Sequence, residues 1–137
     1  MDEDECEVFI ENVKLRFPDG TFYYPDVMLV CDTSDQHRHY RTHPCFIAEV
    51  LSEGTEPVDR GEKLLRYRMI PSLQTYVLLA QDAIRAEVYR RLTDGSWRYD
   101  VLENDAALEI PCADLTLNVS SLYRGMLNPD LLNPVQP

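Results

Sequence analysis

The chain has 137 residues, of which 45% are hydrophobic and 27% are charged, and its formal net charge is −11. This length fits a single soluble globular domain with a hydrophobic core, and no apolar run approaches the roughly 18 residues of a membrane span. The acidic balance excludes broad nonspecific nucleic-acid binding, because basic side chains that neutralise phosphates dominate that affinity.

The N-terminal segment predicts a location and a first pair of strands. MDEDECEVFIEN is acidic and lacks the basic and apolar regions of a secretory signal, so a cytoplasmic location is expected. CEVFIENVKLRF (6–17) predicts one strand with loose alternation, followed by a turn at Pro18-Asp19-Gly20. The continuous apolar run 27–31 is typical of a strand buried on both faces.

A polar connection of 13 residues, 32–44, follows that strand. Its length is typical of a functional loop. Arg38 and Arg41 are candidates for contact with a nucleic-acid backbone. The loop also carries three histidines between two cysteines, but their spacing fits no structural zinc pattern, so a polar loop is favoured over a metal site. These histidines are His37, His39 and His43.

The next strand, Cys45 to Leu51, is apolar except for Glu49. After it, a helix is predicted to begin at Asp59, which could cap it with Glu62 three residues on, and to end before Pro71. Further along, QTYVLLAQ predicts a strand, and IRAEVYRRL and WRYDVL predict a hairpin.

The end of the chain predicts a short helix capped near Ser120 or Ser121. A single domain is expected over 1–126, with a poorly ordered or partner-docked tail over 127–137. The order of strands, one central helix and more strands predicts an α/β fold, a mixed β-sheet with a helix packed on it.

The four cysteines are scattered without a CxxC pair. Two of them lie in apolar runs, where a reduced thiol behaves as a small hydrophobic side chain. The sequence therefore predicts reduced thiols rather than disulfides at Cys6, Cys31, Cys45 and Cys112.

Two carboxylates are predicted to converge. If the two buried strands pair antiparallel, Asp26 at the start of the first and Glu49 near the end of the second reach the same end of the sheet. Their repulsion must be relieved by protonation, by a cation or by distance. Carboxylate oxygens suit Mg²⁺ or Mn²⁺, and Lys63 on the helix could point at the same place and polarise a water.

Structural alternatives exist for each of these residues. Asp26 follows a proline and fits a turn at the start of a strand. Glu49 fits a salt bridge with Lys63 or an arginine. Lys63 itself fits an i, i+4 pair with Asp59 on a solvated helix face. Tyr67 fits the core, with its hydroxyl able to reach the site.

Several short motifs in order carry a resemblance to a known family. They are YPDV at 24–27, IAEVLS at 47–52, DRGEKL at 59–64 with Tyr67, and PSL at 71–73 with Tyr76. Over about residues 7–125 the chain resembles the Uma-two family of restriction-endonuclease-like proteins, within the PD-(D/E)XK nuclease superfamily. Members usually have a longer N-terminal portion with a helix and a further acidic residue, so a shortened site and a homodimer are expected.

The resemblance implies a restriction-endonuclease-like fold with Asp26 and Glu49 as the metal-binding pair and the Val50 carbonyl as a further ligand. The superfamily lysine position holds Leu51 here, so its role would pass to Lys63. The expected function is a divalent-metal-dependent endonuclease acting on DNA, with Mg²⁺ or Mn²⁺ as cofactor and Arg60 as a third DNA contact. The alternative is a catalytically inactive interaction or regulatory module on the same scaffold. Neither a membrane nor a small-molecule cofactor is expected to take part.

Overall fold

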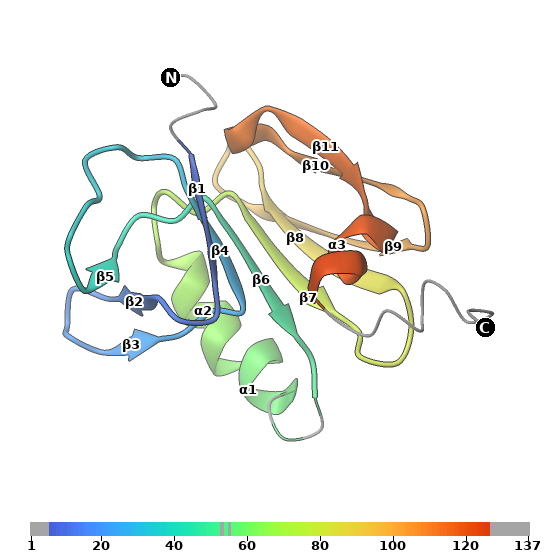
Figure 1. The fold of residues 1–137 in the computed structure, drawn as a ribbon, viewed down its shortest axis with the longest axis horizontal. Helices are drawn as coiled ribbons and strands as arrows, with labels where there is room; N and C mark the ends of the chain where they lie inside the picture. Colours follow the sequence, from blue (N-terminus) through green and yellow to red (C-terminus); the bar gives the residue numbers. More distant parts are fainter. Residues whose placement is uncertain (1–5, 53, 55, 127–137) are drawn as a thin grey trace.

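The computed structural model describes residues 6–52, 54 and 56–126, with the backbone alone at 59 and 124–126. Its centre is a six-stranded sheet (Figure 1), in which β6 and β7 are parallel and the other neighbours are antiparallel. In spatial order the strands are β1 (Glu7–Ile10), β4 (Val27–Val30), β6 (Phe46–Val50), β7 (Thr75–Leu79), β8 (Arg85–Arg91) and β9 (Trp97–Glu103). The predicted mixed sheet is confirmed.

One face of this sheet is covered by two short helices, α1 (Glu56–Arg60) and α2 (Glu62–Arg68). A small three-stranded sheet lies beside them and consists of β2 (Lys14–Arg16), β3 (Phe22–Tyr23) and β5 (Tyr40–Arg41). Alternate residues of the central strands pack here with Tyr67 of α2 and Leu15 of β2. This face therefore has its own apolar core, and the helix expected on the sheet is present.

The opposite face is covered by the C-terminal part of the chain. A hairpin of β10 (Ala107–Ile110) and β11 (Leu115–Asn118), joined through the 3-10 turn η2 (Pro111–Ala113), is followed by α3 (Val119–Met126). Leu108, Val119 and Tyr123 pack against the other alternate residues of β4, β6, β7 and β8. The predicted C-terminal helix is confirmed, whereas the hairpin before it was not predicted. In the described segments no helix is long and apolar enough to cross a bilayer.

The predicted strand over 6–17 is wrong, because this segment forms two strands in different sheets. β1 ends at Ile10, and Glu11 adopts a positive φ of 63°. There the Glu11 N–H donates to the Asp26 carbonyl at 3.0 Å, and the chain turns away into β2. Loose alternation of apolar residues could not reveal this bend.

The predicted helix start at Asp59 is also wrong. α1 begins at Glu56, whose N–H donates to the Ser52 carbonyl at 2.8 Å. Pro57 fits the first turn of α1, because a backbone N–H at this position would have no hydrogen-bond partner within the helix. α2 then starts after Gly61, which makes no side-chain cap, and a Cβ at this position would lie 3.0 Å from the Pro57 carbonyl oxygen. A side chain at position 61 would therefore crowd this carbonyl. The predicted end of the helix before Pro71 is confirmed.

The prediction of reduced cysteines is wrong in this structure, which contains disulfides between Cys6 and Cys31 and between Cys45 and Cys112. The first pair extends the register of β1 and β4, where Glu7 faces Val30. The second joins the start of β6 to η2. Both pairs depend on contacts between segments far apart along the chain, which the spacing of the cysteines does not encode.

Candidate active site

Antiparallel pairing of β4 and β6 brings the two predicted acidic residues together. Val27 lies opposite Ala48, so Asp26 and Glu49 occupy the next opposed positions. The Asp26 N–H donates to Glu49 Oε1 at 3.2 Å, and the Val50 N–H donates to Asp26 Oδ2 at 2.7 Å. The predicted meeting of these residues at one end of the sheet is confirmed, and the main chain of Val50 borders the same place.

Helix α2 places a cation and a hydroxyl on the same carboxylate. Lys63 Nζ lies 3.1 Å from Glu49 Oε2, and the Tyr67 hydroxyl donates to the same oxygen at 2.8 Å. Their i, i+4 spacing sets both side chains on the helix face that is directed at the sheet. Tyr67 is fully buried, as expected for a core residue. The proposed site is thus assembled from two strands and one helix.

Burial dominates the electrostatics of this cluster. Glu49 is only 2% exposed, and loss of solvation raises its pKa to about 7, although Lys63 and Tyr67 oppose the rise. The negative charge of Asp26 adds to the increase in pKa. Glu49 therefore changes its charge near neutral pH. A cation that binds the ionised carboxylate would lower this pKa.

We expect this carboxyl group to make stability depend on pH. In the absence of divalent metal, unfolded Glu49 releases its proton near its ordinary value of 4.5, whereas folded Glu49 keeps it to about pH 7. The folded state binds more protons, so its free energy of unfolding should fall between pH 5 and pH 7 by up to about 3 kcal/mol. Urea denaturation across this range, with wild type and Glu49→Gln compared, isolates the effect.

Glu49→Gln should remove that fall, because glutamine does not titrate. Glu103→Gln, at an exposed carboxylate of β9, serves as the matched control and should retain it. If the free energy of unfolding depends on pH in the same way for wild type and Glu49→Gln, titration of Glu49 is not the cause of the fall.

A second buried carboxylate, Glu87 on β8, was not singled out by the sequence analysis. It lies in the same row across the sheet as Glu49, since both face Leu78 of β7. Arg60 donates to both Glu87 oxygens, one at 2.6 Å, and the Tyr99 hydroxyl donates at 2.7 Å. These contacts, Arg60 first, hold the pKa of Glu87 below its ordinary value despite burial. The sequence feature that could have identified this residue is the position of an acid between Ala86 and Val88 in an apolar strand.

Replacing Arg60 by methionine is expected to lower the free energy of unfolding by about 2 kcal/mol, because Glu87 would stay buried without its cation. Urea denaturation measures the loss, and Glu87→Gln on the same background should restore part of it. Arg98→Met, which breaks an exposed pair with Asp100, should change stability by less than about 0.5 kcal/mol. If the two arginine substitutions lower the free energy of unfolding equally, the Arg60–Glu87 pair stabilises the fold no more than the exposed pair does.

The three arginines predicted to contact DNA lie in different settings. Arg38 is exposed in the 32–44 connection. Arg41 lies over the Phe9 ring, 4.8 Å from its centroid, and donates to the His37 carbonyl at 2.6 Å. Arg60 pairs with Glu87 in the row of the sheet that contains Glu49. Of the three, Arg38 has the most exposed setting.

Asp35 organises part of the 32–44 connection through hydrogen bonds to its main chain. Asp35 is buried and accepts the N–H groups of Thr42 at 2.9 Å and His43 at 2.7 Å. His37 stacks on Tyr40 at 3.7 Å between ring centroids. Among the side chains that the structure describes, the metal-type ligands that converge in a group of three or more are cysteines and include no histidine.

The cavity that opens beside α2 is separate from the carboxylates. It has a volume of about 570 Å³, and its lining comes from 16–19, 42–43, 66 and 69–71. Asp26, Glu49 and Lys63 are not among these residues.

Comparison with known proteins gives consistent matches. The family model described as "Uma2: Putative restriction endonuclease" matches residues 1–120. Two relatives come from Synechocystis sp. and are named as uncharacterized proteins. The first, slr1290, is 32% identical over 128 residues, covering 92% of this chain and 67% of the relative. The second, sll1609, is 35% identical over 97 residues. The match covers 68% of this chain and 55% of the relative, little more than half of that protein.

A solved structure shows the same fold. The crystal structure of a protein from Anabaena variabilis, described as "a putative nuclease belonging to DUF820", superposes with a TM-score of 0.66 at 19% identity. The match covers 90% of this chain and 70% of that one. The nuclease-like α/β fold class predicted from the sequence is confirmed.

Proposed function

The chain belongs to the Uma2 family, and from that premise we propose that it is a divalent-metal-dependent endonuclease that hydrolyses phosphodiester bonds in DNA. One observation carries the proposal. Asp26 and Glu49 are opposed on neighbouring strands, and the Lys63 ammonium lies 3.1 Å from Glu49. Two carboxylates that could hold a metal ion, with an amine beside them, fit metal-assisted phosphodiester cleavage.

The residues at this place fit a hard cation. Asp26 and Glu49 offer carboxylate oxygens and Val50 a main-chain carbonyl, and oxygen-only donor sets suit Mg²⁺ or Mn²⁺. A bound divalent ion would polarise the scissile phosphate and lower the pKa of a coordinated water. Glu49, whose pKa is about 7, ionises in the pH range where such a cation would compete with its proton.

The helix supplies the other groups. Lys63 is proposed to hold the attacking water and to stabilise the ionised form of Glu49. Tyr67 fixes the orientation of the Glu49 carboxylate through its hydroxyl. Leu51 occupies the position that is usually a lysine, but it is buried in the apolar core and has no amine to act on a water. Lys63 is therefore the lysine that contacts this carboxylate.

A non-catalytic interaction module is the second candidate. The specific observation in its favour is that Glu49 Oε2 already accepts from Lys63 and Tyr67, which is how a structural salt bridge is satisfied. In that account the cluster would hold α2 on the sheet and would bind no metal. The two candidates make opposite predictions about cleavage.

The proposal is tested by incubating supercoiled plasmid with the protein and Mg²⁺ or Mn²⁺. We expect conversion to nicked circles and its loss on addition of EDTA. A structured RNA tested in parallel assigns the substrate class. No conversion with either metal between pH 6 and pH 9 would favour the non-catalytic module.

The proposed assembly is a homodimer. β1 lies at the edge of the main sheet and exposes Val8 and Ile10, which are 61% and 54% accessible. An apolar edge strand of this kind favours pairing with another copy. Light scattering should give twice the monomer mass of 15.9 kDa. A monomer mass at micromolar concentration would contradict this part of the proposal.

A further inference from the structure

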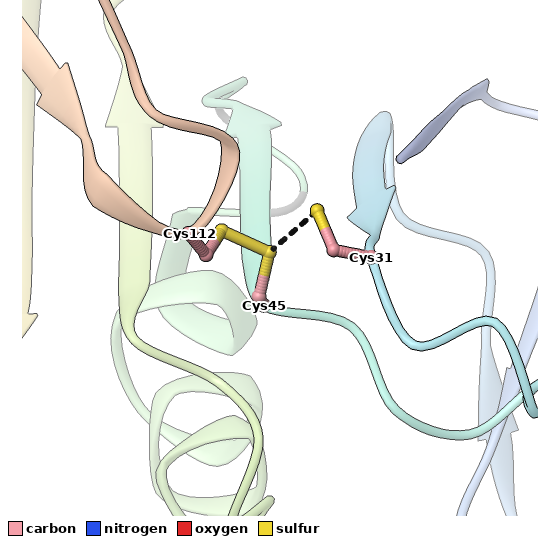
Figure 2. A group of neighbouring side chains, drawn as sticks. All are labelled: Cys31, Cys45 and Cys112. Carbon is pink, nitrogen blue, oxygen red and sulfur yellow. Dashed lines mark hydrogen bonds between the residues drawn. A yellow bond between two sulfur atoms is a disulfide. The ribbon is translucent and has the colours of Figure 1, made fainter. Parts of the chain in front are cut away.

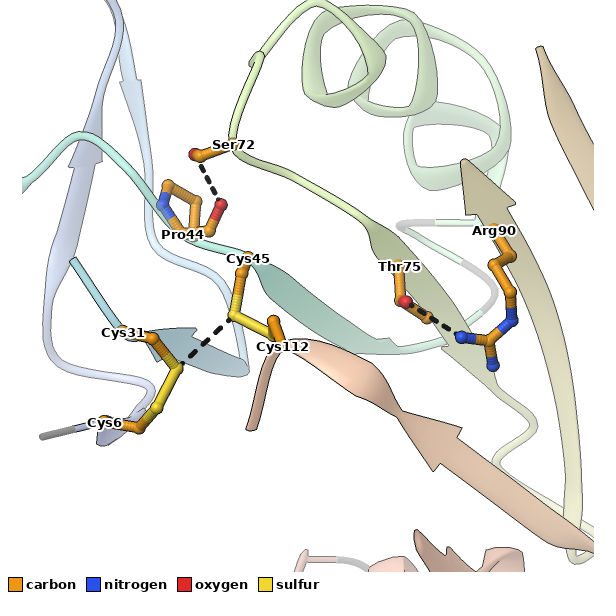
Figure 3. Close-up of a disulfide and its surroundings, with 8 residues drawn as sticks. All are labelled: Cys6, Cys31, Pro44, Cys45, Ser72, Thr75, Arg90 and Cys112. Carbon is orange, nitrogen blue, oxygen red and sulfur yellow. Dashed lines mark hydrogen bonds between the residues drawn. A yellow bond between two sulfur atoms is a disulfide. The ribbon is translucent and has the colours of Figure 1, made fainter. Parts of the chain in front are cut away.

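All four cysteines meet at one place, although they come from four parts of the chain. Cys6 precedes β1, Cys31 follows β4, Cys45 precedes β6 and Cys112 lies in η2. Figure 2 shows Cys31 directed at the Cys45–Cys112 bridge, and Figure 3 adds Cys6 at the far side of Cys31. The two disulfides therefore lie next to each other.

Three of the four sulfur atoms lie as close together as the ligands of one metal ion. Cys31 Sγ and Cys45 Sγ are 3.7 Å apart, and the sulfurs of Cys31, Cys45 and Cys112 all lie within 4.8 Å of one another. Because both sulfurs of the closest pair belong to disulfides, neither carries a proton, and the contact is one of van der Waals type. A Zn–S bond of about 2.3 Å gives a tetrahedron with sulfur atoms roughly 3.8 Å apart. Cys6 is bonded to Cys31 but lies outside the group of three, and each bridge holds its two sulfurs closer than about 3.8 Å. Reduction would therefore have to separate the bonded sulfurs before the four could hold one ion.

We propose that the reduced protein binds one Zn²⁺ through Cys6, Cys31, Cys45 and Cys112. Reduction of each disulfide takes two electrons and two protons, supplied by a dithiol or by a phosphine with water, and yields two thiols. The four thiols then lose their protons as the thiolates bind the ion, because thiolate is the ligand form. Oxidation by a two-electron acceptor such as a disulfide or peroxide, two equivalents in all, restores both bridges and releases the metal.

The surroundings suit a structural site for a soft cation. Cys31 and Cys45 are 4% and 6% exposed within the apolar core, while Cys6 and Cys112 are half-buried. The ion would join β1, β4 and β6 to the hairpin that follows β9. Each bridge already makes part of this connection, so the bound metal and the disulfides would be alternative ways of fixing the same contact.

This site is separate from the proposed nuclease site. The cysteines pack with Phe46 and Ala48 on the face covered by the C-terminal hairpin, whereas Tyr67 holds Glu49 on the helix-covered face. They also lie at the other end of β4, since Asp26 precedes this strand and Cys31 follows it. The inference thus does not rest on the proposed cleavage of DNA.

Cobalt titration of the phosphine-reduced protein, without oxygen, tests the proposal. We expect one equivalent of Co²⁺ to give a sulfur-to-cobalt charge-transfer band and the intense visible bands of tetrahedral cobalt, and one equivalent of Zn²⁺ to abolish both. The untreated disulfide form should give neither. Reduced protein that keeps its circular dichroism spectrum and gives no charge-transfer band would overturn the proposal.

Two variants make the result specific. Cys112→Ser should weaken Co²⁺ binding at least tenfold and reduce the charge-transfer intensity, because one thiolate is lost. Glu49→Gln should leave the bands unchanged, which separates this site from the nuclease site. If reduction unfolds the chain, recovery of the native circular dichroism on adding Zn²⁺ supports the site. Binding of Co²⁺ without such recovery, or with equal strength by Cys112→Ser, contradicts it.

Discussion

Glu49→Gln is expected to lower metal-dependent nicking of supercoiled plasmid by at least about 100-fold, because the loss of a carboxylate ligand removes several kcal/mol of transition-state stabilisation. Glutamine keeps the shape of the side chain, and its carbonyl oxygen can still accept from Lys63 and Tyr67, so the fold should persist with loss of the hydrogen bond from the Asp26 N–H. The measurement is the initial rate of nicking at saturating Mn²⁺, with circular dichroism of the same samples.

Glu103→Gln is the matched control, since it removes one negative charge from an exposed position on β9. It should nick at the wild-type rate. If Glu49→Gln and Glu103→Gln are equally active, the activity resides elsewhere in the molecule or in a contaminant, and Glu49 is not a metal ligand.

Lys63→Met should lower the nicking rate by about 10- to 100-fold, within the range that a positioned acid–base group supplies. It should also shift the remaining activity to higher pH. The reason is electrostatic, because the ammonium of Lys63 lowers the pKa of Glu49, and its removal lets burial raise that pKa above about 7. More alkaline solution is then needed to ionise the carboxyl group and to bind metal. Rates measured from pH 6 to pH 9 give both effects.

The shift in the pH profile separates a role at the site from a purely structural one. Lys14→Met is a suitable comparison, because Lys14 lies 4.3 Å from the centroid of the Phe22 ring on the small sheet. It should leave the pH profile in place. A Lys63→Met protein whose rate falls equally at every pH would indicate that the lysine only holds α2 in position.

The carboxylate pair could be predicted because its geometry follows from local patterns. Two apolar runs close in sequence predicted neighbouring antiparallel strands, and that pairing alone sets Asp26 opposite Glu49. Lys63 followed from the position of the helix directly after the second strand. The periodicity of Lys63 and Tyr67 then placed both on one face.

The remaining features depend on contacts that no local pattern carries. The pairing of Arg60 with Glu87 joins a helix to a strand 27 residues away. The bridge between Cys45 and Cys112 spans 67 residues. The bend at Glu11 requires a positive φ that an acidic residue does not signal. The division into α1 and α2 occurs at Gly61, where the backbone departs from helical geometry with φ −108° and ψ −89°.

Diffraction from crystals soaked in Mn²⁺, with data collected to exploit its anomalous scattering, tests the central claim most directly. The account predicts an anomalous peak within coordination distance of carboxylate oxygens from both Asp26 and Glu49, and its disappearance in Asp26→Ala. The soak is made at a pH above 8, where Glu49 is ionised. The absence of an anomalous peak between these two residues would contradict the proposed metal site.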